Sequence, residues 1–195
     1  MHLHPLFYLA GIASAMPALG GLEQLRRDAC PRDLPPLPGF EFPHLIVPIS
    51  KAQPDVANPN SFSPSITAND IATVFNFDIV RDNQDCELGF YFPRLEQLNM
   101  SSFSFSGTGT FTTSINQPGT GAQDGVTTWN NQPAAGPYAE FPKTITMSPG
   151  NYYSLWIGAC PVGLWSITVT SPDTLFQWFQ SYASCPIGPY VTYSG

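Results

Sequence analysis

A period-two alternation of apolar side chains over residues 73–92 constrains the fold of this chain more than any other feature. The apolar positions form two runs, first Phe75, Phe77 and Ile79, and then Cys86, Leu88, Phe90 and Phe92. A period of two is typical of β-strands with one buried face. The residues between the runs, 81–85, are all polar and rich in Asp and Asn, which favour turns. We therefore predict a β-hairpin over residues 73–92.

Further strand-like segments follow one another along the chain, separated by Pro, Gly and Asn turn signals. They cover residues 44–49, 101–115, 141–147, 152–158, 164–170 and 187–193. Gly107 and Gly109 are expected to divide the second of these at a bend. About eight short strands without alternating helices favour an all-β fold, namely an antiparallel β-sandwich that is jelly-roll-like.

Helix is expected in at most one short piece. Residues 94–100 are long enough to form one helical turn. Residues 171–182 fit a capped helix, and a strand over 175–180 fits nearly as well, so both interpretations stay open. Residues 116–138 carry several turn signals and little apolar alternation, and we expect them to form the longest loop, with Trp129 inside it.

The first 20 residues have the pattern of a secretory signal peptide. An apolar run over residues 6–13 precedes small residues that include an Ala-x-Ala cleavage site. The run is too short to span a bilayer. Residues 21–42 are interpreted as a propeptide and proline-rich lead-in containing the pair Arg26-Arg27, and residues 43–195 as the domain. We predict a secreted protein, located in the medium or the cell wall.

Charge and composition exclude several kinds of partner. The net charge is −7, the sequence pI is about 4.6, and charged residues make up only 11% of the chain. Phosphate-rich partners need a basic surface, so we expect neither nucleic acid nor an anionic membrane as a ligand. An aromatic content of 13% argues against a disordered chain.

The cysteines predict disulfides rather than a metal site. There are four of them, Cys30, Cys86, Cys160 and Cys185. Behind a signal peptide an even number indicates two disulfides, with three connectivities open. Zinc ligands usually include two cysteines only a few residues apart, and no such pair exists here. The one N-x-S/T sequon places a candidate glycosylation site at Asn99.

Residue content argues against most catalytic centres. Removal of residues 1–20 leaves His44 as the single histidine, so a three-His metal site is excluded and a Ser-His-Asp triad would depend on a residue that we expect to be structural. We predict no cofactor and no enzyme activity. A glycosidase needs only two facing carboxylates, for which Asp78, Glu87 and Glu140 are candidates; solvated, outward-facing carboxylates are the favoured interpretation.

Aromatic residues outside the apparent core are candidates for carbohydrate contact. They lie in loops or on the opposite strand parity, and comprise Trp129, Tyr138, Tyr152, Trp156 and Tyr190. Sugar rings stack on exposed Trp and Tyr, and β-sandwiches often display such rings. The alternative is that these rings pack against covered faces of the sandwich.

Several motifs carry a resemblance to a known family. FNFDI at residues 75–79 is followed by a short polar loop and by the pattern C-x-L-x-F-x-F-P at residues 86–93. Further motifs are PHLIVP at 43–48, SFSFSG at 102–107 and CPIG at 185–188. By their sequences and their order along the chain, these motifs resemble the fungal ubiquitin-3 binding protein But-two C-terminal domain family.

The resemblance implies a domain of fungal secreted and surface proteins that has no established reaction. Cys86 and Cys160 occupy positions that the family tends to fill, which implies a Cys86–Cys160 disulfide and leaves Cys30–Cys185 as the second. The family name also implies the activating enzyme of a ubiquitin-like modifier as a partner. Because that enzyme is intracellular and this chain carries an export signal, we expect the two to be separated.

The functional expectation is therefore a secreted, non-enzymatic fungal protein that acts at or outside the cell wall. Its expected partners are cell-wall polysaccharide or another extracellular protein. A carbohydrate-binding module that uses surface aromatics is the second hypothesis, and a glycoside hydrolase with paired carboxylates is the third.

Overall fold

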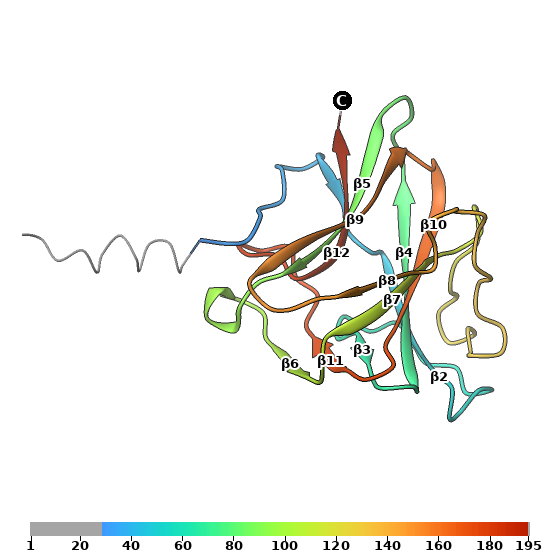
Figure 1. The fold of residues 1–195 in the computed structure, drawn as a ribbon. Coiled ribbons are helices and arrows are strands. Elements are labelled where there is room, and N and C mark those ends of the chain that lie inside the picture. The colour runs from blue at the N-terminus through green and yellow to red at the C-terminus, as the bar shows by residue number, and fades with distance from the viewer. Residues whose placement is uncertain (1–28, 195) are drawn as a thin grey trace, which may run out of the picture.

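The computed structural model describes residues 29–194, which form an antiparallel all-β fold of twelve strands in three sheets (Figure 1). This confirms the predicted fold class. More strands are present than the expected eight or so because several segments of only two to four residues also pair. The predicted signal peptide and the Arg26-Arg27 pair lie outside the described residues.

Two of the sheets face each other across the core. One has the order β1 (Phe40–Glu41), β12 (Gly188–Ser194), β5 (Asp85–Phe92) and β9 (Asn151–Ala159). The other has the order β2 (Leu45–Ser50), β4 (Ile71–Ile79), β10 (Gly163–Thr170), β7 (Thr110–Ile115) and β8 (Lys143–Thr146). The expected first strand is thus β2, at the edge of the five-stranded sheet.

A small third sheet closes the lower end of the sandwich in Figure 1. Its order is β3 (Ser65–Ile66), β11 (Leu175–Trp178) and β6 (Phe103–Ser106). β11 corrects the helical interpretation of residues 171–182. Phe176 and Trp178 are buried while Leu175 and Gln177 are exposed, so the period is two and the strand interpretation is right. The only helical turn within residues 29–194 is a 3-10 helix at Leu95–Gln97.

The predicted hairpin over residues 73–92 is wrong in its pairing, although both strands form. β4 pairs with β2 and β10, whereas β5 pairs with β12 and β9 in the opposite sheet. The polar residues between them carry the chain from one sheet to the other. The alternation correctly identified the buried faces, because periodicity reports which side of a strand is covered and not which strand lies beside it.

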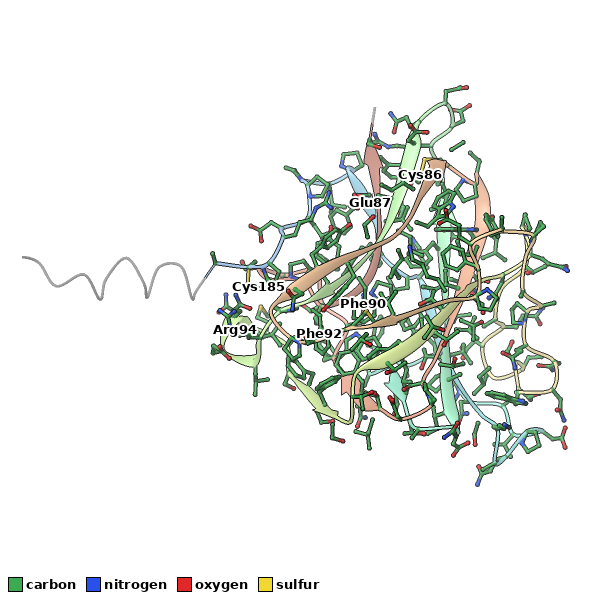
Figure 2. The ribbon with its side chains drawn as sticks, viewed as in Figure 1. Cys86, Glu87, Phe90, Phe92, Arg94 and Cys185 are labelled. Carbon is green, nitrogen blue, oxygen red and sulfur yellow. A yellow bond between two sulfur atoms is a disulfide. The ribbon has the colours of Figure 1, made fainter. Side chains whose placement is uncertain are left out.

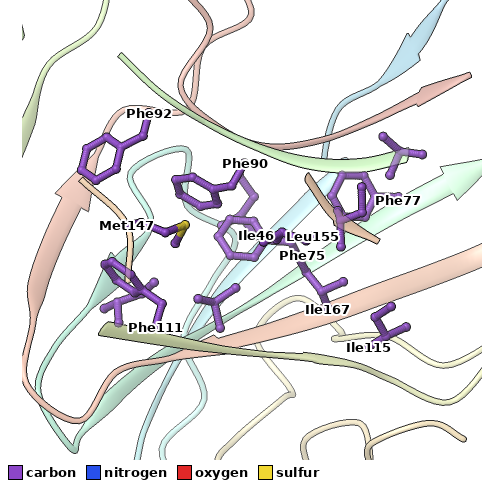
Figure 3. Close-up of a cluster of buried hydrophobic side chains, with 14 of the residues drawn as sticks. Ile46, Phe75, Phe77, Phe90, Phe92, Phe111, Ile115, Met147, Leu155 and Ile167 are labelled. Atoms are coloured by element: carbon purple, nitrogen blue, oxygen red, sulfur yellow. The ribbon is translucent and has the colours of Figure 1, made fainter. Parts of the chain in front are cut away.

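Aromatic rings from all three sheets form one core (Figure 3). Phe75 and Phe77 of β4 enter it from one side, and Phe90 and Phe92 of β5 enter it from the other. Phe176 of the small sheet stacks on Trp178 with ring centroids 4.3 Å apart. Each buried ring contributes about 2 kcal/mol through the hydrophobic effect, so this cluster is the main source of stability.

Gly107 and Gly109 divide residues 101–115 into β6 and β7, as expected. Both have positive φ angles, of 108° and 82°. A Cβ atom at Gly109 would lie 2.1 Å from the carbonyl oxygen of Met147. Only glycine fits this close approach, and the bend lets β6 join the small sheet while β7 joins the five-stranded one.

Two disulfides join segments that are far apart in the sequence (Figure 2). They are Cys30–Cys185 and Cys86–Cys160, the pairing that the family resemblance implied. The first ties the lead-in to the segment before β12, and the second ties β5 to the turn after β9. Within residues 29–194, no helix is long and apolar enough to cross a membrane.

Candidate functional site

The long loop of residues 116–142, yellow to gold in Figure 1, lies against the outer face of the five-stranded sheet. The side-chain amide of Asn76 on β4 donates to the carbonyl of Ala122 and accepts from its N–H, both at 2.9 Å. At the start of the loop, the side-chain amide of Asn116 donates to the hydroxyls of Ser166 and Thr168 on β10 and can accept from that of Thr168. Because these side chains are buried, their hydrogen bonds hold the loop in place.

Trp129 lies in this loop, half-buried at the edge of an apolar patch. The patch consists of outward side chains of β2 and β4 together with one residue of the loop, namely Val47, Ile49, Ala72, Val74 and Ala122. Asn130, the next residue, bonds to Asp55 at 2.7 Å. The indole therefore packs against the apolar patch, and the residue that follows it is fixed by a hydrogen bond.

A pocket of about 260 Å³ opens beside Trp129, where β2 ends, β4 begins and β10 ends. Besides the indole, its wall is formed mainly by polar side chains, principally Lys51, Asn69, Asp70, Thr112 and Thr170. Thr112 and Thr170 lie opposite each other on β7 and β10. The pocket thus has one aromatic wall, and most of its other lining side chains are polar.

Hydrogen bonds within the protein orient the polar wall. Asp70 accepts from the N–H of Ala52 at 2.9 Å and from the hydroxyl of Ser50 at 2.8 Å, and these bonds lower the pKa of its carboxyl group. Asn69 donates to the carbonyl of Pro172 at 2.6 Å. The side chain of Lys51 forms no ion pair within residues 29–194. A fixed carboxylate, a free ammonium group and an indole therefore share one small space.

The described residues around the pocket supply one indole, one ammonium group, one carboxylate and several hydroxyl groups. Residues 29–194 contain no group of three or more His, Cys, Asp or Glu side chains able to hold a metal ion. Ring stacking and hydrogen bonds to hydroxyl groups are the interactions that the pocket can provide.

The family of the chain follows from a comparison of sequences. Residues 41–184 match the family model of the ubiquitin 3 binding protein But2 C-terminal domain. The chain belongs to this family. No curated protein matches the chain. The But2 match includes Cys86, Cys160 and all the pocket residues, while β12 and both ends of the Cys30–Cys185 bridge lie outside it.

Of the five predicted carbohydrate contacts, only Trp129 lines the pocket. Tyr190 is fully buried, and its hydroxyl donates to the carbonyl of Ser181 at 2.5 Å, so its placement on the surface is wrong. Tyr138 packs against the core and accepts a hydrogen bond from the indole N–H of Trp165 at 3.2 Å. These rings are structural and do not form a common surface.

Trp156 corrects a prediction based on strand parity. The register between β5 and β9 shifts between Leu88 and Gly89, which leaves Leu155 as an extra residue in β9. This β-bulge reverses the alternation, so Trp156 packs against Trp165 in the core with ring centroids 5.3 Å apart. Tyr152, which shares the parity of Trp156 in the sequence, remains on the outer face of the sheet.

The predicted pair of carboxylates does not come together. Asp78 is exposed on β4, Glu87 lies on β5 in the opposite sheet, and each is flanked by core residues, so the two side chains point away from each other. Glu140 is exposed in the long loop. Asp78 and Glu87 therefore do not face each other, as two-carboxylate hydrolysis requires.

Glu87, which is labelled in Figure 2, belongs to a network of polar side chains on the outer face of its sheet. It accepts from the Tyr152 hydroxyl at 2.6 Å and pairs with Arg32 of the lead-in at 3.0 Å. Burial alone would raise the pKa of Glu87, but the hydrogen bonds outweigh it and the pKa lies below its ordinary value. Burial raises the pKa of the neighbouring Tyr91 to about 12. The network fixes the lead-in.

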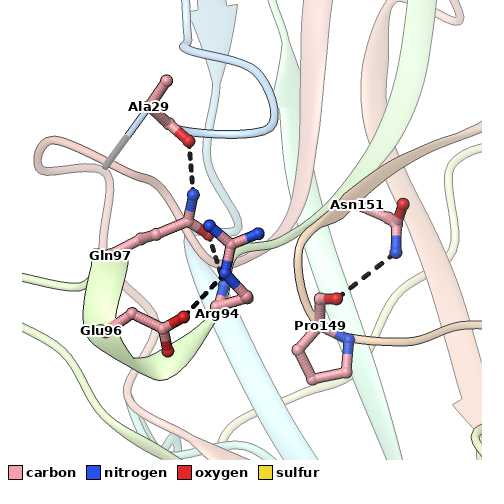
Figure 4. A network of polar contacts seen from close by, with 6 residues as sticks. All are labelled: Ala29, Arg94, Glu96, Gln97, Pro149 and Asn151. Carbon is pink, nitrogen blue, oxygen red and sulfur yellow. Dashed lines mark hydrogen bonds and ion pairs between the residues drawn. The ribbon is translucent and has the colours of Figure 1, made fainter. Parts of the chain in front are cut away.

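The structure also shows the surroundings of two further residues that the sequence analysis named, Asn99 and His44. Asn99 is exposed between the 3-10 helix and β6, where a glycan has room. The 3-10 helix itself contacts the lead-in through Gln97, which donates to the carbonyl of Ala29, while Arg94 pairs with Glu96 at 2.7 Å (Figure 4). His44 stacks on Phe42 with ring centroids 4.7 Å apart and lies 3.4 Å from Glu41.

Most of the pocket in the But2 domain was not predicted from the sequence. Lys51, Asp70, Thr112 and Thr170 come from four segments, and no spacing motif links them. The only local signal was a tryptophan inside a polar, turn-rich loop. Such a residue is seldom retained in a loop without either packing or a ligand.

Proposed function

We propose that this But2 domain protein is exported and acts outside the cell, in the medium or associated with a fungal cell wall, as a non-enzymatic binding protein. The observation that carries the proposal is the pair of disulfides, which join residues 155 and 74 positions apart. Such bridges form and persist in oxidising compartments and are rare in the cytosol.

The signal-peptide pattern of residues 1–20 supports the same location independently. The candidate glycosylation site agrees with it, since Asn99 is exposed. The intracellular activating enzyme in the family name is a poor partner for a protein with this export pattern. Polysaccharide of the wall or another extracellular protein is the partner that we propose.

A binding role is favoured over hydrolysis by the surroundings of the acidic residues. Glu87 is engaged by Arg32 and Tyr152, and Asp78 lies in the other sheet. Neither is available to act with the other across a cleft. The pocket beside Trp129 favours a carbohydrate as the ligand, which is the second hypothesis from the sequence.

The test is the intact mass of the protein recovered from fungal culture medium. Full-length chain is expressed, and its mass is measured before and after reduction and after deglycosylation. We expect a chain shortened at its N-terminus that gains about four hydrogens on reduction, the number taken up by two disulfides. A full-length intracellular chain with free thiols would overturn the proposal.

A further inference from the structure

We infer that the pocket beside Trp129 binds a single neutral sugar residue of an extracellular glycan. The inference rests on the proposed function, since it assigns a ligand class to a protein placed outside the cell. It differs from the aromatic surface expected from the sequence, because four of the five rings proposed for that surface do not line the pocket.

The aromatic wall is already in position before any ligand arrives. Trp129 packs against the apolar patch formed by β2, β4 and Ala122, and the loop that carries it is bonded to the sheet through Asn76 and Ala122. A ring that is held in place loses little side-chain entropy on binding. The apolar C–H face of a pyranose can stack on such an indole.

The polar wall matches the rim of hydroxyl groups on a sugar. Asp70 uses one carboxylate oxygen, Oδ1, for Ser50 and Ala52, and a carboxylate can accept several further hydrogen bonds. Lys51 supplies three N–H donors that are not engaged by another described side chain. Donors and acceptors on one side and a ring on the other are the arrangement that an amphipathic sugar requires.

Size and charge narrow the class of ligand. A volume of about 260 Å³ falls below the range of roughly 300–1,000 Å³ that holds drug-sized molecules, so one sugar residue fits and a long stretch of polysaccharide does not. One cation and one anion line the pocket, and the chain as a whole has a net charge of −7. Both features favour a neutral sugar over a uronic acid or a phosphorylated one.

The inference is tested by isothermal titration calorimetry on the purified, oxidised full chain. The probes are laminarin, chitin and mannan oligosaccharides, with oligogalacturonate as the anionic control. We expect at least one of the neutral series to bind and oligogalacturonate not to bind. Failure of every neutral series, or tighter binding of oligogalacturonate, would overturn the inference.

Three variants locate the site. Trp129→Ala removes the stacking ring and Lys51→Ala removes the ammonium donor, and each is expected to weaken binding about tenfold, which corresponds to the loss of one good contact. Tyr182→Ala is the matched control, since it removes a 57% exposed ring outside the pocket. Its Kd should equal that of the wild type.

The Lys51→Ala variant is expected to fold, because the Lys51 side chain forms no ion pair with another described residue. Thermal melting of all three variants verifies that they fold. If both pocket variants bind the sugar with the affinity of the wild type, the binding site lies elsewhere and the inference is overturned. The proposed function is tested separately by the mass measurement. A full-length intracellular chain with free thiols would overturn that function, whatever result the calorimetry gives.

Discussion

Arg32 of the lead-in lies 3.0 Å from the carboxylate of Glu87 on β5, an ion pair that spans 55 residues of sequence. The same guanidinium lies over the ring of Tyr152, 4.3 Å from its centroid. Tyr152 in turn donates its hydroxyl hydrogen to Glu87. The lead-in is therefore fastened to the four-stranded sheet by a charged network as well as by the Cys30–Cys185 disulfide.

Glu87→Gln is expected to lower the free energy of unfolding by about 1 kcal/mol at pH 7, because the pair is lost and Arg32 is 42% exposed to screening solvent. The folded pKa of Glu87 is lowered, so its contribution is present above the unfolded value of about 4.3 and disappears as the pH falls through the folded pKa. Urea denaturation of the wild type and the variant at pH 7 and below pH 3 measures the stability difference and its disappearance in acid. Glu140→Gln, at an exposed site, is the control, and a difference that persists in acid would contradict the assignment.

Asn76→Ala is expected to loosen the long loop without unfolding the sheets. The substitution leaves the buried N–H and carbonyl of Ala122 without partners, at a cost of about 2–3 kcal/mol. Hydrogen exchange should accelerate in residues 116–142 and remain slow in β4 and β10. Asn151→Ala is the control. Because the hydrogen bonds of Asn151 are exposed, this substitution should change neither the stability nor the hydrogen exchange of the loop much. Uniform acceleration throughout the domain would show that the loop is not an independent unit.

Gly109→Ala is expected to be strongly destabilising, because the added Cβ would lie 2.1 Å from the Met147 carbonyl oxygen. Gly119→Ala provides the matched comparison. Its φ angle of 74° is similar to the 82° of Gly109, yet no atom lies within 4 Å of an added Cβ. The Gly119 variant should lose only about 1 kcal/mol from backbone strain. Equal midpoints in thermal denaturation would mean that the contact with Met147 is not rigid.

The two disulfides are expected to have different effects when they are replaced by serine pairs. Loss of Cys86–Cys160 should destabilise the whole domain by about 2–5 kcal/mol, since Cys86 is fully buried in the core. Loss of Cys30–Cys185 should mainly release the lead-in, which is detected as new protease cleavage between residues 30 and 40. Cleavage at that place in the Cys86–Cys160 variant alone would reverse this assignment.

Local periodicity predicted the fold class and most strands, but not their neighbours. Phe75 and Phe90 were placed correctly in the core because alternation depends on only a few adjacent residues. The separation of β4 and β5 into opposite sheets, and the inversion of Trp156 by the bulge at Leu155, depend on contacts with distant strands. The pocket could not be predicted for the same reason, since its walls come from residues spread between 51 and 172.

The position of β12 has a consequence for the time at which this protein can fold. β12 lies between β1 and β5, so the four-stranded sheet is divided until residues 188–194 have been synthesised. Pairings this distant in sequence form slowly. A chain that has to wait for β12 cannot complete this sheet during synthesis, and an unfolded chain is the form that passes through a translocation channel. If the protein is exported as proposed above, its folding, and with it the joining of Cys30 to Cys185, would begin on the far side of the membrane.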